Sequence, residues 1–420
     1  MPRPRPAEHW TVEDAERWLL SLELFGMRFG LNRMRRLMTT LGNPHERFRA
    51  VHVVGTNGKS STTRMTAAIL ARHGVRTGAY LSPHLVSFAE RILIDGADVA
   101  GDAFARACSR AKHAADLVNR TGSEDDRVTQ FEALTAAAFS ELAEQGVEVA
   151  VVEAGLGGRY DATNVLHAEV AVLTNVGLEH TRVLGPTITH IAREKLAVVE
   201  PGATLVVGAQ LDPAAELEAE ETAIRQDARM VHAERDTDVP LLAQGAFQRG
   251  NFATARAAAE ALIGPLDEVA VREAAASTLV PGRFEVVADR PVVVLDGAHN
   301  EGGIQALAAT LPAWLRGRRL VAVISVLDDK DAAAMLGALL PLCDGVVFTA
   351  NANPRALSPA TLQSLAGQLD GPPAHVEADP RRALEVAKRI AGEEGVVLAT
   401  GSIYLIADLL RPPGRRGATI

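Results

Sequence analysis

The chain has 420 residues and a formal net charge of -9, with 47% hydrophobic and 23% charged residues. This composition is typical of a folded globular protein and excludes a disordered or collagen-like chain. The negative charge argues against a nucleic-acid-binding protein, because such proteins carry basic surface that neutralises phosphates. Two cysteines, no apolar signal segment after MPRPRPAEHW and no run of 18 uncharged apolar residues favour a cytoplasmic protein.

Apolar runs rich in valine, isoleucine and leucine alternate along the chain with alanine-rich stretches of helical pattern. This alternation predicts an α/β protein with parallel sheets covered by helices on both faces, and the length predicts two or three domains. The predicted strands are 51–54, 147–153, 169–174, 203–207, 284–288, 292–296, 320–324, 345–349 and 395–400, and the predicted helices include 62–73, 134–145 and 253–263. The acidic segment 211–238 is predicted to be a peripheral helix or hairpin.

The segment VHVVGTNGKSSTT, residues 51–63, joins a predicted strand to a predicted helix through a glycine-rich turn. Glycines let backbone N–H groups face a phosphate, and the helix N-terminus and Lys59 add positive charge. Only two residues separate the glycines, where the general phosphate loop has four, so an ordinary capped turn remains an alternative. The predicted nucleotide-contacting residues of the loop are Gly55, Thr56, Asn57, Gly58, Lys59, Ser60 and Ser61.

Two other predicted strands end in polar, glycine-containing loops. Glu153 precedes AGLGGRYDATN, residues 154–164, and His180 lies in TNVGLEHT, residues 174–181. Ligands bind at the carboxyl ends of parallel strands, and an acid beside a phosphate loop is placed to hold Mg²⁺. The alternatives are that Glu153 forms an ion pair with Arg159 and that His180 is an ordinary core or surface histidine.

The order of these motifs resembles that of the folylpolyglutamate synthases and dihydrofolate synthases, which belong to the Mur ligase superfamily. The resemblance covers essentially the whole chain and rests on GTNGKSS (55–61), LSPHLVSFAERI (81–92), TQFEALTAAAF (129–139), VEAGLGGRYDATN (152–164), GLEHTRVLG (177–185), IAREK (191–195), PGRFE (281–285), DGAHN (296–300) and TGSIYL (400–405). It implies a phosphate-loop ATPase domain with a folate pocket, residues 1–280, and a smaller Rossmann-like glutamate ligase domain, residues 281–420. The Pro-Gly pair at 281–282 favours the same boundary.

The resemblance implies an ATP-dependent ligase that phosphorylates a folate-type acid and lets the amine of L-glutamate attack the acyl phosphate. Such chemistry depends on positioning and on electrostatic stabilisation by Mg²⁺ and cations. The implied catalytic residues are Lys59, His180 and Lys195, and the implied ligands of two Mg²⁺ ions are Ser60, Ser82, Glu153, His180 and Lys195. Lys195 matches a lysine that these enzymes commonly carbamylate; unmodified, it would be a further cation or an exposed helix lysine.

The resemblance also assigns the remaining nucleotide and acceptor contacts. ATP would lie between the two domains and also contact Asn251, Arg283, Asp296 and His299. Arg283 as a linker arginine and Asp296 as a turn former are the alternatives. The folate or pteroate pocket would be lined by Ser82, Pro83, His84, Thr129, Gln130, Phe131, Glu132, Tyr160, Asp161 and Ala162. Phe131 and Tyr160 are suited to packing on flat rings, although Phe131 also fits an ordinary core position.

Four positions depart from the usual family pattern: Ser60 replaces a glycine, Glu179 an aspartate and Glu301 a proline, and LAVVEP follows Lys195. They leave the acceptor open between dihydropteroate, a reduced folate or both. The functional alternatives are a related ligase for another carboxylic acid, such as a cell-wall nucleotide precursor, and a nucleotide-binding protein that has lost catalysis. The resemblance implies a monomer with small-molecule partners, without nucleic acid or membrane.

Overall fold

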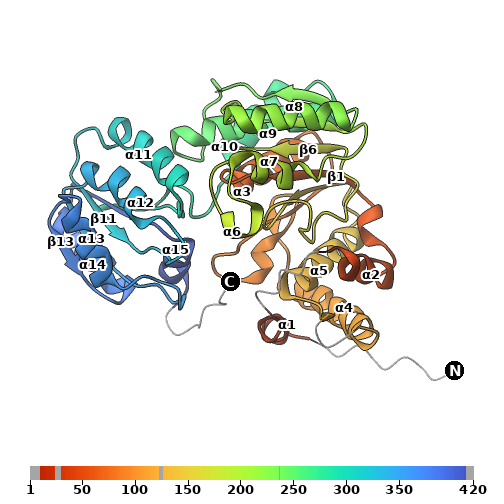
Figure 1. Cartoon of the computed structure of the whole chain (residues 1–420), viewed down its shortest axis with the longest axis horizontal. Helices are drawn as coiled ribbons and strands as arrows, with labels where there is room; N and C mark the ends of the chain where they lie inside the picture. The colour runs from red at the N-terminus through yellow and green to blue at the C-terminus, as the bar shows by residue number, and fades with distance from the viewer. Residues whose placement is uncertain (1–9, 24–29, 123–125, 236, 413–420) are drawn as a thin grey trace. The chain divides into compact units, whose positions relative to one another are not determined.

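The computed structural model describes residues 10–23, 30–122, 126–235 and 237–412 (Figure 1). The chain forms two compact units: the first takes in residues up to Arg235 and Phe252–Ala274, and the second takes in residues 236–251 and the chain from Ala275 onward. Each unit contains one mainly parallel β-sheet with helices packed on it. The predicted α/β fold class is therefore confirmed.

The sheet of the first unit has eight strands in the order β4-β3-β2-β5-β1-β6-β7-β8. Neighbours from β2 to β8 run parallel, whereas β3 and β4 pair antiparallel at one edge. The central strands β5 and β6 are buried throughout, which agrees with their apolar sequences up to Glu153. The bounds are β1 Arg49–Val54, β2 Thr77–Tyr80, β3 Ile92–Ile94, β4 Ala97–Asp98, β5 Val149–Glu153, β6 Val170–Leu173, β7 Thr204–Val207 and β8 Arg229–His232.

Helices of the first unit pack on this sheet and on one another. On one face, α7 and α8 lie side by side, and Ile191 and Ala215 join a core with Leu173 and Leu205 (Figure 1). Elsewhere α4 and α5 pack together, with α1 and α2 against them. The bounds are α1 Val12–Ser21, α2 Asn32–Thr40, η1 Pro44–Glu46, α3 Lys59–Arg72, η2 Phe88–Arg91, α4 Gly101–Arg120, α5 Gln130–Glu144, α6 Thr181–Leu184, α7 Ile188–Leu196 and α8 Pro213–Arg225, followed by α9 Ala246–Ile263 and α10 Glu268–Ser277, which each include residues of both units.

The second unit has a six-stranded sheet in the order β13-β12-β11-β14-β10-β9, with β9 antiparallel to β10 and the other pairs parallel. A hydrophobic core of this unit joins Ile304, Met335 and Leu362 from three helices to strand residues such as Ala322 and Phe348. The bounds are β9 Glu285–Asp289, β10 Val292–Leu295, α11 Glu301–Leu315, β11 Leu320–Ile324, α12 Ala332–Leu339, η4 Leu340–Leu342, β12 Gly345–Phe348, α13 Pro359–Gln368, β13 Ala374–Val376, α14 Pro380–Ala391, β14 Val396–Thr400 and α15 Ile403–Leu410.

Every predicted strand is present to within two residues, and the acidic segment 211–238 contains α8 and β8. The strands β2, β3, β4, β8 and β13 were not predicted, because they are short or lie at sheet edges. None of the described helices is long and apolar enough to cross a membrane.

Candidate active site

The turn after β1 has the backbone geometry that its glycines predict. Gly58 adopts a left-handed conformation, φ 82° and ψ -8°, and α3 begins at the next residue, Lys59. A Cβ at Gly55 would clash with the hydroxyl of Thr174, so this position also needs glycine. The N-terminus of α3 and its preceding N–H groups are thus arranged as in a phosphate-binding loop.

The loop is held by the residues that follow β6. The amide N–H of Asn57 donates to Oδ1 of Asn175 over 2.8 Å, and the Thr174 hydroxyl donates to the Asn57 carbonyl over 2.6 Å. The N–H of Gly177 donates to Oγ1 of Thr56 over 3.0 Å. Sequence reasoning assigned no role to Thr174 or Asn175, although their position directly after a strand beside β1 was a usable signal.

Two lysines converge on one carbonyl oxygen of this loop. Nζ of Lys59 lies 3.1 Å from the Gly55 carbonyl oxygen, and Nζ of Lys195, at the end of α7, lies 2.7 Å from the same atom. Lys195 is only 4% exposed, which excludes the alternative of an exposed helix lysine. Burial, followed by the nearby charge of Lys59, lowers the pKa of Lys195 to about 7, so the amine is partly unprotonated at neutral pH.

Three of the predicted metal-binding residues come together at the carboxyl end of β5. The Ser60 hydroxyl donates to Oε1 of Glu153 over 2.9 Å, and the backbone N–H of Ser82 donates to Oε2 over 3.0 Å. Arg159 instead forms its ion pair with Glu194, at 2.8 Å, so it does not neutralise Glu153 as the alternative required. One carboxylate with two hydroxyls is an oxygen donor set that suits Mg²⁺, with phosphate and water completing the coordination.

His180 lies in the loop that follows β6. It precedes α6 with a left-handed backbone, φ 51°, and its Nε2 lies 3.6 Å from Oε1 of Glu179. Its side chain is 37% exposed, which leaves the imidazole accessible to a ligand. Metal binding by His180 stays a prediction.

The glycine-rich loop after β5 packs on the end of α7, which carries Lys195. A Cβ at Gly158 would lie 2.5 Å from the carbonyl oxygen of Lys195, and the N–H of Arg159 donates to the Glu194 carbonyl over 2.9 Å. Asp161 closes the loop, because its Oδ2 accepts from the N–H of Leu156 over 2.8 Å. Burial raises the pKa of Asp161, which is 6% exposed.

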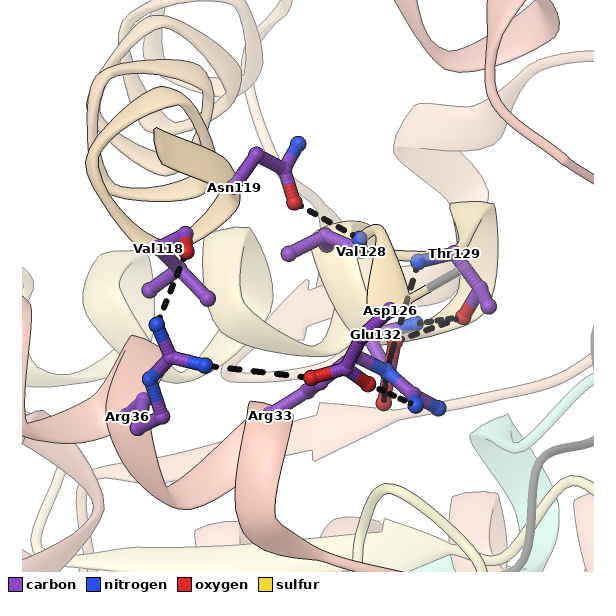
Figure 2. Close-up of polar contacts among 8 residues, drawn as sticks. All are labelled: Arg33, Arg36, Val118, Asn119, Asp126, Val128, Thr129 and Glu132. Carbon is purple, nitrogen blue, oxygen red and sulfur yellow. Dashed lines mark hydrogen bonds and ion pairs between the residues drawn. The ribbon is translucent and has the colours of Figure 1, made fainter. Parts of the chain in front are cut away.

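The start of α5 is tied to α2 by the network in Figure 2. The Thr129 N–H and hydroxyl donate to Oε2 of Glu132 over 2.9 and 3.0 Å, and Nε of Arg33 donates to both Glu132 oxygens over 3.1 Å. Arg33 also pairs with Asp126 at 2.7 Å, and Arg36 lies 3.9 Å from the same carboxylate. These predicted acceptor residues therefore have protein partners, and Arg33 is a buried residue that sequence reasoning missed.

The other predicted acceptor residues lie on α5 and in the glycine-rich loop after β5. Nε2 of Gln130 donates to the Leu19 carbonyl over 2.8 Å. A Cβ at Gly155 would lie 2.6 Å from the Phe131 ring, so the ring packs directly under the glycine-rich loop. Tyr160 is 42% exposed in that loop, and Ala162 is buried beside it. A lining role for each of these residues stays a prediction.

The segment after β2 brings a buried histidine beside the predicted acceptor residues Ser82 and Pro83. His84 is 2% exposed, its Nδ1 accepts from Nε of Arg91 over 3.1 Å, and its ring lies 4.2 Å from that of Phe88. These contacts fix the imidazole, while its binding role stays a prediction.

Three residues predicted for the second unit, Arg283, Asp296 and His299, lie together where β10 ends. Asp296 is 2% exposed; its Oδ2 accepts from the Phe284 N–H and its Oδ1 from the Ala298 N–H, both over 2.8 Å. A Cβ at Gly297 would clash with the Arg283 guanidinium, so glycine lets this arginine lie across the loop. Burial raises the pKa of Asp296, against the opposing charges of Arg283 and His299. Asn251, from α9, donates to Oε1 of Gln248 over 2.9 Å.

The chain matches two family models, the Mur ligase middle domain over residues 53–235 and the Mur ligase glutamate ligase domain over residues 282–403. It is 36% identical over 381 residues to the dihydrofolate synthase/folylpolyglutamate synthase of Mycobacterium tuberculosis, covering 81% of this chain and 78% of the relative. The chain belongs to this family of Mur ligases. It is an ATP-dependent, ADP-forming acid–amino-acid ligase.

Solved structures of related proteins superpose on this chain over nearly its full length. The folylpolyglutamate synthase of Mycobacterium tuberculosis, complexed with ADP, superposes with a TM-score of 0.89 at 33% identity and covers 95% of this chain and 97% of that chain. A bifunctional folylpolyglutamate synthase/dihydrofolate synthase with Mn, AMPPNP and L-glutamate bound has a TM-score of 0.84 at 27% identity, covering 97% and 99%. The family resemblance inferred from the motifs is thus confirmed, whereas the individual site residues are not tested by these likenesses.

Proposed function

We propose that this ligase joins L-glutamate to the carboxylate of dihydropteroate, of a reduced folate, or of both, through an acyl phosphate. The observation that carries the proposal is the cluster of Lys59, Ser60, Ser82 and Glu153 at one edge of the first sheet. It combines a phosphate loop with oxygen ligands for a divalent ion. The names of the matched relatives, and the nucleotide, metal and glutamate in one of them, support the choice of substrates.

Within this proposal, the phosphate loop binds the ATP phosphates through its N–H groups, the start of α3 and Lys59. Glu153, Ser60 and Ser82 would hold Mg²⁺, with His180 as a further ligand. An ion bound there would supply positive charge beside the phosphoryl group that is transferred. Because the transfer has little covalent chemistry for the protein to supply, these residues act by position and charge.

Lys195 is proposed to bind CO₂. Its buried, partly unprotonated amine attacks the carbon of CO₂, so that a C–N bond forms and one C=O π bond opens to place the charge on oxygen. The proton released from the nitrogen passes to solvent water, and the product is a carbamate. The product carries one negative charge on oxygen, so it is suited to hold a second Mg²⁺. Carbamylation would also remove the repulsion between Lys195 and Lys59, which is the second cause of the lowered pKa.

The remaining predicted roles complete the proposal. Arg283, Asp296, His299 and Asn251 contact the nucleotide, and the acceptor is bound by residues of the three segments 82–84, 129–132 and 160–162. Residues 1–280 supply ATP and acceptor binding and residues 281–420 supply glutamate ligation. The protein acts in the cytoplasm as a monomer on small-molecule substrates.

The test is phosphate release by the purified protein with Mg-ATP and L-glutamate, with dihydropteroate in one reaction and tetrahydrofolate in another, followed by product masses. A gain of one glutamate on dihydropteroate identifies dihydrofolate synthase activity. A gain on tetrahydrofolate identifies folylpolyglutamate synthase activity, and both gains identify a bifunctional enzyme. If the protein adds glutamate to neither acceptor, the folate proposal is refuted and a ligase for another acid is favoured.

A further inference from the structure

The central strand of the first sheet carries one polar side chain inside an apolar run. His52 lies in β1 between valines and is 0% exposed. Side chains two residues apart share a face of a strand, so His52 lies on the same face as Val54, whose core includes Ile191 of α7. A buried histidine in a central strand requires hydrogen-bond partners, because burial without them costs free energy.

Its partner lies in the glycine-rich loop after β5. Nε2 of His52 lies 2.8 Å from Oγ1 of Thr163, and this hydroxyl lies 2.5 Å from Oδ1 of Asp161. Oδ1 also accepts from the Thr163 N–H over 3.0 Å, and Oδ2 accepts from the N–H of Leu156 over 2.8 Å. The three side chains therefore form a continuous buried chain from β1 to the loop.

The direction of each hydrogen bond follows from the groups themselves. Both oxygens of Asp161 accept from backbone N–H groups, and the Thr163 hydroxyl donates to Oδ1, so the oxygen of this hydroxyl accepts from Nε2 of His52. His52 therefore carries a proton on Nε2, and Nδ1 has no hydrogen-bond partner within the described part of the chain. Burial lowers the pKa of His52 to about 4, so the imidazole is neutral at neutral pH and Nε2 holds its one proton.

We propose that His52 is a positioning residue for the acceptor: through Thr163 it fixes Asp161 and hence the segment Tyr160–Ala162. This inference rests on the proposed function, which assigns that segment to the acceptor pocket. His52 stands three residues before Gly55, so one rigid strand would set both the phosphate loop and the acceptor loop. The arrangement keeps the acid near the phosphate to be transferred, where small displacements reduce rate strongly.

The first experiment removes the Thr163 hydroxyl, which links His52 to Asp161. Thr163→Val keeps the shape of the side chain, and Thr163→Ser keeps the hydroxyl. We expect Thr163→Val to raise the KM for the pteroate acceptor about 10-fold, the lower end of what outer-shell hydrogen bonds contribute, with a much smaller change in the KM for ATP. Thr163→Ser should stay within about twofold of wild type.

A matched control removes a buried hydroxyl elsewhere. Thr222 is 1% exposed on α8, a helix outside the three segments assigned to the acceptor, and it accepts from Nη2 of Arg225 over 2.7 Å. Thr222→Val should leave the KM for acceptor and for ATP unchanged. If Thr163→Val raises both KM values equally, or changes neither, the positioning role is refuted.

The second experiment tests His52 itself. His52→Leu removes the N–H donor and should raise the KM for the acceptor. Gln places an N–H donor near the position of Nε2, so the KM for the acceptor of His52→Gln should stay close to that of the wild type. The KM for the acceptor of the double variant His52→Leu/Thr163→Val should equal that of Thr163→Val, because both changes interrupt the same series of hydrogen bonds. Fully additive effects would refute the link, and if His52→Leu does not fold, the two Thr163 variants decide the question.

Wild-type turnover separates the two levels of inference. If the wild-type protein converts neither dihydropteroate nor tetrahydrofolate, the proposed function fails and this positioning role fails with it. If the wild type turns over but the acceptor KM of Thr163→Val is unchanged, only the role of His52 and Thr163 is overturned.

Discussion

Glu153 and Asp296 occupy equivalent positions in the two sheets, yet their partners differ. Each is a buried carboxylate where a parallel strand ends, Glu153 in the last position of β5 and Asp296 directly after β10. Glu153 accepts from the Ser60 hydroxyl and the Ser82 N–H, whereas each oxygen of Asp296 accepts from a backbone N–H.

This difference indicates two uses for a buried carboxylate at the end of a strand. A hydroxyl beside a carboxylate can rotate its hydrogen away and present oxygen to a cation, so Glu153 and Ser60 form a donor set for a metal. Backbone N–H groups cannot do so. Asp296 therefore acts first as the brace that joins the turn at Phe284 to the loop at Ala298, and its predicted contact with ATP would be an additional role.

We expect the largest effect from a substitution at Glu153 that removes its charge and keeps its shape. Glu153→Gln removes the negative charge but keeps an oxygen that accepts hydrogen bonds. We expect kcat to fall by about 1000-fold, as when a preorganised electrostatic group is lost from an active site, with little change in thermal stability. Phosphate release at saturating ATP and acceptor, with Mg²⁺ titrated, measures the effect.

The control for this substitution is Glu169→Gln. Glu169 pairs with Arg49 at the opposite end of β1, and its side chain is 50% exposed, so removing its charge should leave kcat unchanged. Activity of Glu153→Gln within about threefold of wild type would contradict the metal assignment.

Much of the fold could be predicted because its signals are local. Unbroken apolar runs mark the buried strands, and GTNGK marks the loop between β1 and α3. Short strands such as β3, next to the edge strand β4, and β13, at the edge of the second sheet, have only three residues each, so they leave no clear periodicity.

The site was predicted in part for the same reason. The convergence of Ser60, Ser82 and Glu153 follows from strand order, because β2 and β1 both flank β5. The partners of Thr129 and Glu132 were not predictable in this way: the Arg33–Glu132 pair joins residues 99 positions apart in sequence. Single-sequence reasoning has no local signal for such a contact, and the same holds for His52 and Thr163.

Acid should weaken the first unit through His52. Its pKa is about 4 in the folded protein, against 6.5 for a solvated histidine, so the unfolded chain binds more protons between these values. Stability therefore falls as pH decreases through this window, by at most roughly 3 kcal/mol, which is 2.5 pH units at about 1.36 kcal/mol each. Neither histidine of the second unit, His299 or His375, is buried.

Urea unfolding at several pH values between 4.5 and 7 tests this expectation. A Trp314→Phe background leaves Trp10 and Trp18, both in the first unit, as the fluorescent reporters. Over the same pH range, the free energy of unfolding should fall less for His52→Gln made in this Trp314→Phe background than for the background protein itself. Parallel curves for the two proteins would show that the buried imidazole does not cause the acid sensitivity.

The smallest expected effect tests whether Asp296 acts as a brace. Asp296→Ala leaves the N–H groups of Phe284 and Ala298 without their acceptor, so we expect the second unit to lose about 2 kcal/mol, and Asp296→Asn, which keeps one acceptor oxygen, to lose less. Trp314 is a suitable probe because its ring lies 5.1 Å from that of Phe284, edge to face. Urea unfolding followed through Trp314, in a background with Trp10 and Trp18 replaced by Phe, measures the loss. If Asp296→Ala removes activity without lowering the stability reported by Trp314, Asp296 acts on the nucleotide and is not a brace. The roles of Glu153 and Asp296 would then be more alike than their hydrogen-bond partners suggest.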